Sequence, residues 1–255
     1  MTRARFFLAA DQWQEGALVL TGDEAKHCAQ VTRHRVGDEI IVFDGMGRRA
    51  TTRIESMTRQ QVDLSILSVV TQCDVGKPIT LVQGITKGDA MEWIIEKAVE
   101  LGVRRIIPMM SARSIVRLDA GEATKKRDKW QRLALEACKQ CGQDWLTDVV
   151  APSDLATAIK LCEGATLKFV ASLHDQARPL RTLWNRDHDD GNPAVTGAAV
   201  AIGPEGDFTE DEYLAFHRAG FRAWSLGART LRSETAAICA LSILGYELAE
   251  DHLPI

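Results

Sequence analysis

The chain has 255 residues, of which 45% are hydrophobic and 26% charged, a balance typical of a globular protein with a substantial core. No apolar run approaches the roughly 20 residues that a membrane-spanning helix needs. The amino-terminal residues also lack the apolar stretch of a secretory signal, so we expect a cytoplasmic protein. The net charge of −4 argues against a protein that holds nucleic acid by overall positive charge alone.

Charge is distributed unevenly along the chain. Residues 1–72 contain nine basic and nine acidic side chains, so the negative excess lies in the remainder. That remainder nevertheless contains one basic cluster, which could bind phosphate locally, although a solvated helix surface is the simpler explanation of the charges alone. The cluster consists of Arg113, Arg117, Lys125, Lys126, Arg127, Lys129 and Arg132.

The six cysteines do not have the dense spacing of a disulfide framework. Cys138 and Cys141 form a lone C-x-x-C motif, which raises the possibility of a zinc or redox site. No second such motif and no closely spaced histidine pair supplies the remaining ligands of a tetrahedral zinc ion. The surrounding residues have a helical period, so we interpret the two thiols as ordinary helix side chains and expect no metal.

The first 72 residues are rich in short β-branched runs separated by glycine and aspartate turns, a pattern that predicts strands. Residues 44–47 resemble a hairpin connection, and a single helix is expected near 23–34. We therefore predict a small β-barrel with one helix over residues 1–72. Glycine and proline punctuate residues 73–78, which we interpret as a linker.

From residue 77 to 255 the pattern predicts alternating strands and helices, and hence an α/β domain with a mainly parallel sheet. Gly102 stands where a helix-ending glycine belongs, and Thr209 to Glu212 form a capping box that opens a helix. Strands are expected at 79–84, 104–109, 165–172, 198–203 and 222–227, and helices at 89–101, 122–141, 153–163, 209–219 and 233–249.

Two late segments, 201–209 and 225–236, each join a predicted strand to a predicted helix. Ligands of open parallel sheets bind outside the carboxyl ends of the strands, where both segments fall. Their glycines allow close backbone approach, their arginines suit phosphate or developing negative charge, and their glutamates could position those arginines or accept a proton. Neither segment matches a standard nucleotide-binding fingerprint, so ordinary strand–helix turns would explain them nearly as well.

A resemblance favours the ligand-binding interpretation. The chain is similar, over nearly its whole length, to the SPOUT class of methyltransferases, and closely to the RsmE family, which methylates N3 of a uridine in 16S ribosomal RNA. The last two of the matching segments are together highly specific. The segments are RFFL (5–8), GDEAKH (22–27), VFDG (42–45), EKAVELGV (96–103), IGPEGDF (202–208) and LGARTLRSETA (226–236).

The resemblance implies a PUA-like RNA-binding barrel at 1–72 and a SPOUT domain at 77–255 that is tied in a deep trefoil knot. It also implies S-adenosylmethionine as cofactor, bound in the knotted loops at a homodimer interface, and the small ribosomal subunit as partner. It places Arg232 and Glu234 beside the cofactor. The catalytic candidates are Arg232 and Glu205, whose side chains suit charge stabilisation and proton removal. The cofactor-binding candidates are Leu173, Gly203, Glu205, Gly206, Leu226, Gly227, Arg229, Leu231 and Glu234.

The chain departs from the family pattern at two positions. Asp207 stands where a second glycine is usual, and Gln143 stands where the family tends to have an arginine. An arginine at position 143 would suit an RNA phosphate, so this chain needs another cation there or binds RNA more weakly. Neither departure alters the cofactor motif.

The chemistry of uridine N3 guides the expected roles. The N3–H is a weakly acidic imide, so Arg232 is the first candidate to stabilise negative charge on the uracil oxygens, and Glu205 could assist removal of the proton. His174 could border the pocket, whereas His27 and His34 suit a surface or RNA contact. Two alternatives remain open: methylation of a ribose or a tRNA base, and an RNA-binding assembly factor without catalysis.

Overall fold

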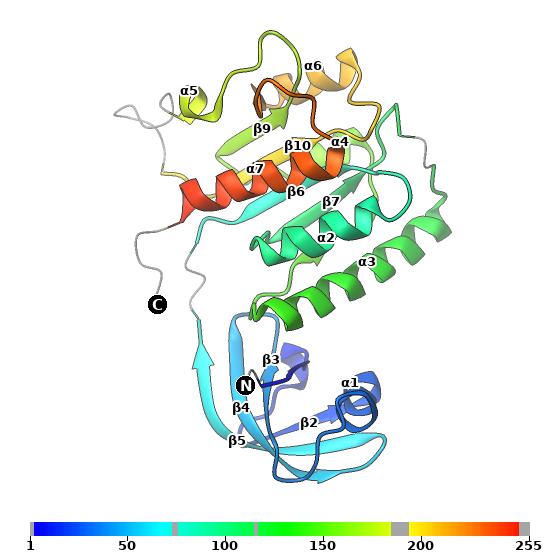
Figure 1. Ribbon diagram of the computed structural model, residues 1–255, viewed down its shortest axis with the longest axis vertical. Helices are drawn as coiled ribbons and strands as arrows, with labels where there is room; N and C mark the ends of the chain where they lie inside the picture. Colours follow the sequence, from blue (N-terminus) through cyan, green and yellow to red (C-terminus); the bar gives the residue numbers. More distant parts are fainter. Residues whose placement is uncertain (1–2, 73–75, 115–116, 185–193, 250–255) are drawn as a thin grey trace. The chain divides into compact units, whose positions relative to one another are not determined.

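The computed structural model describes residues 3–72, 76–114, 117–184 and 194–249 (Figure 1). These residues form two compact units. The first contains the amino-terminal residues together with Leu135–Leu146, and the second contains the rest. Of the linker expected at 73–78, residues 73–75 lie outside the described ranges. Within those ranges, no helix is long and apolar enough to cross a membrane.

The first unit is built on a five-stranded sheet in the order β1-β3-β4-β5-β2. β1 runs parallel to β3, and the other neighbours are antiparallel. One helical segment packs on its core, which confirms the expected β-rich region with one helix. Its elements are β1 (Arg5–Phe7), the 3-10 helix η1 (Ala10–Gln12), β2 (Ala17–Thr21), α1 (Gly22–Lys26), the π-helical turn η2 (His27–Val31), β3 (Glu39–Phe43), β4 (Arg48–Met57) and β5 (Gln61–Thr71).

The core of this sheet follows from the alternation of side chains along each strand. In β2, Leu18 and Leu20 are buried, and the residues at either end of the strand are exposed, because successive side chains point to opposite faces. The helical segment adds Ala25 and Cys28 to the same apolar cluster. Burial raises the pKa of Cys28 to about 11, so its thiol stays protonated and packs as a small apolar group.

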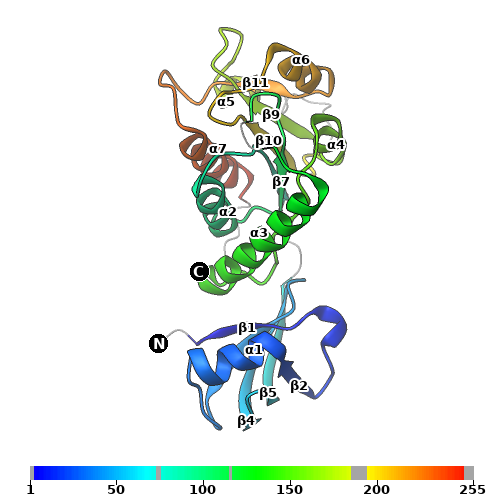
Figure 2. The ribbon, with the colours of Figure 1, turned by 90° about the vertical axis from the view of Figure 1, so that its right-hand side faces the viewer.

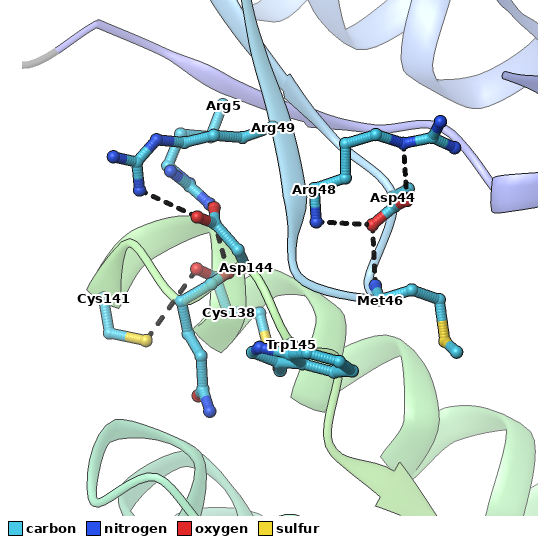
Figure 3. Close-up of polar contacts among 10 residues, drawn as sticks. Arg5, Asp44, Met46, Arg48, Arg49, Cys138, Cys141, Asp144 and Trp145 are labelled. Carbon is cyan, nitrogen blue, oxygen red and sulfur yellow. Dashed lines mark hydrogen bonds and ion pairs between the residues drawn. The ribbon is translucent and has the colours of Figure 1, made fainter. Parts of the chain in front are cut away.

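Residues Leu135–Leu146 are joined to this sheet by a buried carboxylate. The side chain of Asp144 is fully buried, and it accepts hydrogen bonds from Arg5 at 2.5 Å and from Arg49 at 2.8 Å (Figure 3). The Arg5 side chain is itself only 8% exposed. Two cations held this close compensate for the loss of hydration that burial of the carboxylate imposes.

Main-chain contacts and close packing fix the same segment. The Gly47 N–H donates to the Asp144 carbonyl at 3.1 Å, and the Leu146 N–H donates to the Gly45 carbonyl at 3.0 Å. Gly47 has a φ of +90°, and a Cβ there would lie 2.5 Å from the Trp145 ring, so only glycine fits. The end of a helix from the second half of the chain is thus built into the first unit.

The second unit is a six-stranded sheet in the order β11-β9-β10-β6-β7-β8, and every neighbouring pair is parallel. This confirms the expected parallel α/β arrangement. Its strands are β6 (Ile79–Gly84), β7 (Arg105–Met109), β8 (Asp148–Val149), β9 (Leu167–Ala171), β10 (Ala198–Ile202) and β11 (Arg222–Trp224). Its helices are α2 (Ala90–Glu100), α3 (Ala120–Cys141, which continues into the first unit), α4 (Leu155–Lys160), α5 (Leu180–Trp184), α6 (Glu210–Arg218) and α7 (Ser233–Leu248).

Helices cover both faces of this sheet (Figure 2). α2 and α7 contact each other, and α7 also contacts β6 and β10. α4 and α6 cover the opposite face, where Ala158 and Phe216 pack with Ala199 and Ala201 of β10. All five residues of β10 are buried, as expected for a strand covered on both faces. Because the strands are parallel, the loops after β6, β9, β10 and β11 all leave the sheet at the same edge.

Local signals in the sequence explain several element ends. The predicted capping box at Thr209 and Glu212 is present and opens α6, and Gly102 follows α2 with a φ of +79°. The expected strands are all observed, each within three residues of its predicted ends. β8 and α5 were not predicted, because two residues of strand and five of helix are too short to show a period.

We expect Asp144→Asn to destabilise the protein by about 3–5 kcal/mol, because the substitution leaves a buried guanidinium without its counter-ion. Urea unfolding followed by tryptophan fluorescence measures the change. The matched control is Asp148→Asn. Asp148 pairs with Arg105, but both side chains are more than 40% exposed, so we expect a cost of about 0–1 kcal/mol. Equal costs for the two variants would contradict this account of Asp144.

Candidate functional site

A cavity of about 550 Å³ lies at the edge where the parallel strands end. Its wall consists of the ends of β9 and β10 and the loops that follow β9, β10 and β11, together with the first turn of α7, Ala90 of α2 and Tyr213 of α6. The cavity brings together all the predicted site residues except Gly206. Its lining comprises Ala90, Ala171, Ser172, Leu173, Ile202, Gly203, Pro204, Glu205, Asp207, Tyr213, Leu226, Gly227, Arg229, Thr230, Leu231, Arg232, Ser233, Glu234 and Ala236.

The loop after β10 is a tight turn whose glycines have different neighbours. A Cβ on Gly203 would lie 2.9 Å from Oδ1 of Asp207 and 3.2 Å from its Cα, so the turn itself requires glycine there. Gly206 does not line the cavity, and a Cβ there would lie 3.2 Å from the Cβ of Arg113. The Arg113 guanidinium donates to the Gly206 and Phe208 carbonyls, each at 3.2 Å. Arg113 thus supports the turn from outside the cavity.

Glu205 lies on the exposed part of this turn. Its Oε1 accepts a hydrogen bond from the backbone N–H of Lys87 at 2.9 Å, which ties the loop after β6 to the loop after β10. The two loops also approach closely at Gly84, where a Cβ would lie 2.5 Å from Pro204. Glu205 is therefore a carboxylate held in place at a position open to solvent.

The loop after β11 supplies the cationic side of the cavity. Gly227 has a φ of +125°, a conformation that glycine adopts without strain. Arg229 and Arg232 are exposed cavity residues, and Arg232 is the N-cap residue of α7. Glu234 lies in the first turn of that helix, where a carboxylate is stabilised by the helix dipole.

Ser233, at the start of α7, is bonded to the loop after β10 and to the end of β6. The sequence does not reveal this role. Its hydroxyl donates to the Gly203 carbonyl at 2.5 Å and accepts from Nε2 of Gln83 at 2.9 Å. Gln83 and Ser233 are both buried. One hydroxyl thus connects the end of β6, the loop after β10 and the start of α7.

Tyr213 is a second cavity residue that sequence reasoning missed. Its hydroxyl lies 2.8 Å from Oδ1 of Asp207 and 3.2 Å from the Ala171 carbonyl. Burial, and then the negative charge of Asp207, raise the pKa of Tyr213 well above its usual value, so the phenol stays protonated and donates. The ring of His174 packs edge-on against Tyr213 with 4.8 Å between ring centres, which places this histidine beside the cavity wall.

The remaining candidate residues do not line the cavity. His27 and His34 both pack edge-on against Phe6 in the first unit. Gln143 belongs to the segment held by Arg5, which donates to its carbonyl at 3.1 Å. Cys138 is buried, whereas Cys141 is exposed. Over the ranges that the structure describes, no group of three or more His, Cys, Asp or Glu residues could hold a metal ion.

Comparisons with known proteins agree with this architecture. Residues 74–245 match the model of the RNA methyltransferase domain, and residues 20–67 match the RNA methyltransferase PUA domain. The fold and the cavity thus define an RNA methyltransferase with a PUA-like amino-terminal domain.

Individual relatives give a narrower assignment. The ribosomal RNA small subunit methyltransferase E of Bacillus subtilis is 29% identical over 229 residues, 89% of each chain. The crystal structure of the same enzyme from Neisseria gonorrhoeae, bound to S-adenosylmethionine, is 31% identical, with a TM-score of 0.82 over 97% of this chain and 98% of that one. A Legionella pneumophila structure with bound S-adenosylmethionine has 31% identity and a TM-score of 0.84, over 97% and 98% of the two chains. The chain belongs to the RsmE family of small-subunit ribosomal RNA methyltransferases.

We expect Ser233→Ala to destabilise the protein by about 1–3 kcal/mol, because it deprives the buried Gln83 amide and Gly203 carbonyl of a common partner. The control is Ser242→Ala, an exposed serine on the same helix, for which we expect a change within about 0.5 kcal/mol. Thermal unfolding of the two variants measures the difference. A Ser233→Ala variant as stable as the control would show that the hydroxyl does not hold the loops.

Proposed function

We propose that this protein transfers the methyl group of S-adenosylmethionine to N3 of a uridine in 16S ribosomal RNA. The observation that carries the proposal is that residues of the segments 202–208 and 226–236, which α6 and β11 separate in the sequence, line one cavity. The relatives from N. gonorrhoeae and L. pneumophila, both of which hold S-adenosylmethionine, support the cofactor. The RsmE family membership supports the substrate.

The cavity fits such a cofactor. Its volume of about 550 Å³ lies within the roughly 300–1,000 Å³ of small-molecule sites. Apolar side chains of Leu173, Ile202 and Leu231 line it beside the polar backbone of Gly203 and Gly227, a combination that suits an adenosine group. We infer that these residues, with Leu226, Arg229 and Glu234, hold the cofactor.

When bound, S-adenosylmethionine supplies an electrophilic methyl group. The N3 atom of uracil becomes a nucleophile as it loses its proton, and negative charge then spreads over the two neighbouring carbonyl oxygens. Arg232 is exposed at the cavity, so its guanidinium is available to stabilise that charge in the transition state.

We assign removal of the N3 proton to Glu205, directly or through a water molecule. Its Oε1 accepts the Lys87 N–H, which fixes the carboxylate while leaving its second oxygen to accept a proton. Because Glu205 is exposed, the proton can pass on to solvent. Gly206 faces Arg113, so we propose that it shapes the turn rather than contacting the cofactor.

We further propose that the PUA-like domain contacts the ribosomal RNA and that the loops after β10 and β11 belong to a deep trefoil knot. We also propose a homodimer through α7 in a cytoplasmic enzyme. Besides its buried face, α7 has the half-exposed apolar side chains Ile238, Cys239 and Ile243, and Tyr246 is 82% exposed. This leaves apolar surface for a second subunit.

The proposed function is tested in cells that lack their own RsmE enzyme. Expression of this protein should restore 3-methyluridine in 16S ribosomal RNA, measured by mass spectrometry of nuclease digests. We expect Arg232→Ala to abolish the restoration, because loss of a charge-stabilising donor slows turnover by about 10²–10³-fold. Methylation of another nucleotide would overturn the uridine assignment.

Calorimetry separates the roles of Arg232. We expect the Kd for S-adenosylmethionine to change less than about threefold in Arg232→Ala, because the guanidinium acts mainly in the transition state. Arg218→Ala, which removes an exposed arginine of α6 outside the cavity, should retain both binding and turnover. A loss confined to cofactor affinity would make Arg232 a binding residue. Tight cofactor binding by wild-type protein that lacks any methylation activity would favour an RNA-binding assembly factor.

The proposed dimer interface on α7 is tested with a double variant on α7 and a control variant on α6. Ile243→Asp combined with Tyr246→Asp places charge on the exposed apolar side of α7, so we expect a monomer by size-exclusion chromatography with light scattering. The control is Leu214→Asp on α6, where the leucine is 50% exposed and the dimer should persist. A dimeric double variant would show that the interface lies elsewhere.

A further inference from the structure

Asp207 has an unusual backbone conformation for its residue type. Its φ is +59°, and Arg33 is the only other non-glycine residue with a positive φ in the part of the chain that the structure describes. Side chains rarely adopt this left-handed region, although aspartate and asparagine tolerate it better than most. Glycine would relieve the strain, so the aspartate at this turn calls for a reason beyond backbone geometry.

The side chain folds back into the cavity wall. Oδ1 accepts from the Phe208 N–H at 2.8 Å and from the Tyr213 hydroxyl at 2.8 Å, and it lies 2.9 Å from where a Gly203 Cβ would be. Asp207 and Tyr213 both line the cavity. Because the Tyr213 phenol stays protonated, the negative charge of the pair resides on Asp207.

Asp207 shifts the charge balance of the cavity. The other charged residues of its lining are two carboxylates, Glu205 and Glu234, and two guanidiniums, Arg229 and Arg232. The formal charges of those four residues sum to zero, so Asp207 gives the lining a net negative charge. It is also less exposed than Glu205, so solvent screens its charge less.

We propose that Asp207 makes the site prefer the cationic cofactor to its demethylated product, an inference that rests on the proposed function. S-adenosylmethionine carries a positive sulfonium. On methyl transfer the carbon–sulfur electron pair stays on sulfur, which becomes a neutral thioether. A cavity of about 550 Å³ is on the order of 10 Å across, so a fixed carboxylate in its wall attracts a bound cation with little screening. The product loses this attraction, which favours its release.

The test compares the Kd values of three ligands by calorimetry. S-adenosylmethionine and sinefungin, which has a protonated amine in place of the sulfonium, carry the extra positive charge, whereas S-adenosylhomocysteine lacks it. We expect Asp207→Asn to weaken both charged ligands about three- to tenfold and S-adenosylhomocysteine less than twofold. Asparagine keeps the shape, tolerates the left-handed conformation and preserves an acceptor for Phe208 and Tyr213.

A second variant and a control separate charge from structure. Asp207→Gly removes the strain together with the hydrogen bonds, so its structural effects differ from those of asparagine, and only the loss of charge is common to both. Both variants should lower the preference for charged ligands. Asp211→Asn removes an equal charge from an exposed position on α6 outside the cavity, so the preference should remain.

Each other outcome has a defined meaning. Equal weakening of all three ligands in both variants would make Asp207 a purely structural residue and overturn the inference, as would unchanged Kd values. If the wild-type protein binds S-adenosylmethionine but the variants keep its ratio of Kd values between charged and uncharged ligands, this inference alone is refuted. Failure of the wild-type protein to bind any of the three ligands would refute the proposed cofactor, and with it the proposed function.

Discussion

The cavity depends on the hydroxyl of Ser233. The parallel sheet brings the ends of β6 and β10 to one edge, but loops at that edge have no ladder hydrogen bonds to hold them. Ser233 supplies the missing connection, because its hydroxyl donates to the Gly203 carbonyl and accepts from the buried Gln83 amide. A second hydrogen bond, from the Lys87 N–H to Glu205, also connects the loop after β6 to the loop after β10, at an exposed position. These polar contacts fix Gly203 and Glu205 relative to the end of β6 and the start of α7.

Much of this arrangement was predictable from local patterns. The apolar run of β10 and the capping box at Thr209 have short-range physical causes, so the sequence alone places them. Only the resemblance to the RsmE family predicts that Gly203, Leu226 and Arg232 belong to one site. The periodicity of hydrophobic residues indicates helices and strands, but not which loops meet. Ser233 and Tyr213 were missed because a single hydroxyl on a helix carries no signal until its partner from another strand is known.

The interpretation of glycines shows a second limit of sequence reasoning. The sequence suggests one role for Gly203, Gly206 and Gly227, which is close approach to a ligand. The structure adds a different local constraint at each. Gly203 is crowded by its own turn, Gly206 by Arg113, and Gly227 adopts a positive φ in open space. Likewise, nothing in the helical period of α3 indicates that its end joins the first unit, because that depends on Asp144 meeting Arg5 and Arg49 across more than 90 residues of sequence.

The charges of the proposed site must satisfy two opposite demands. A cationic cofactor is attracted by carboxylates, whereas a uracil that loses its N3 proton is stabilised by a cation. A direct ion pair between the two kinds of group would largely neutralise both charges at the site. Here Glu205 and Asp207 follow β10, whereas Arg229, Arg232 and Glu234 follow β11. Among the described side chains, no ion pair joins any two of these five residues. Because the carboxylates and the guanidiniums are not paired with one another, both kinds of charge remain available to the ligands of the proposed site.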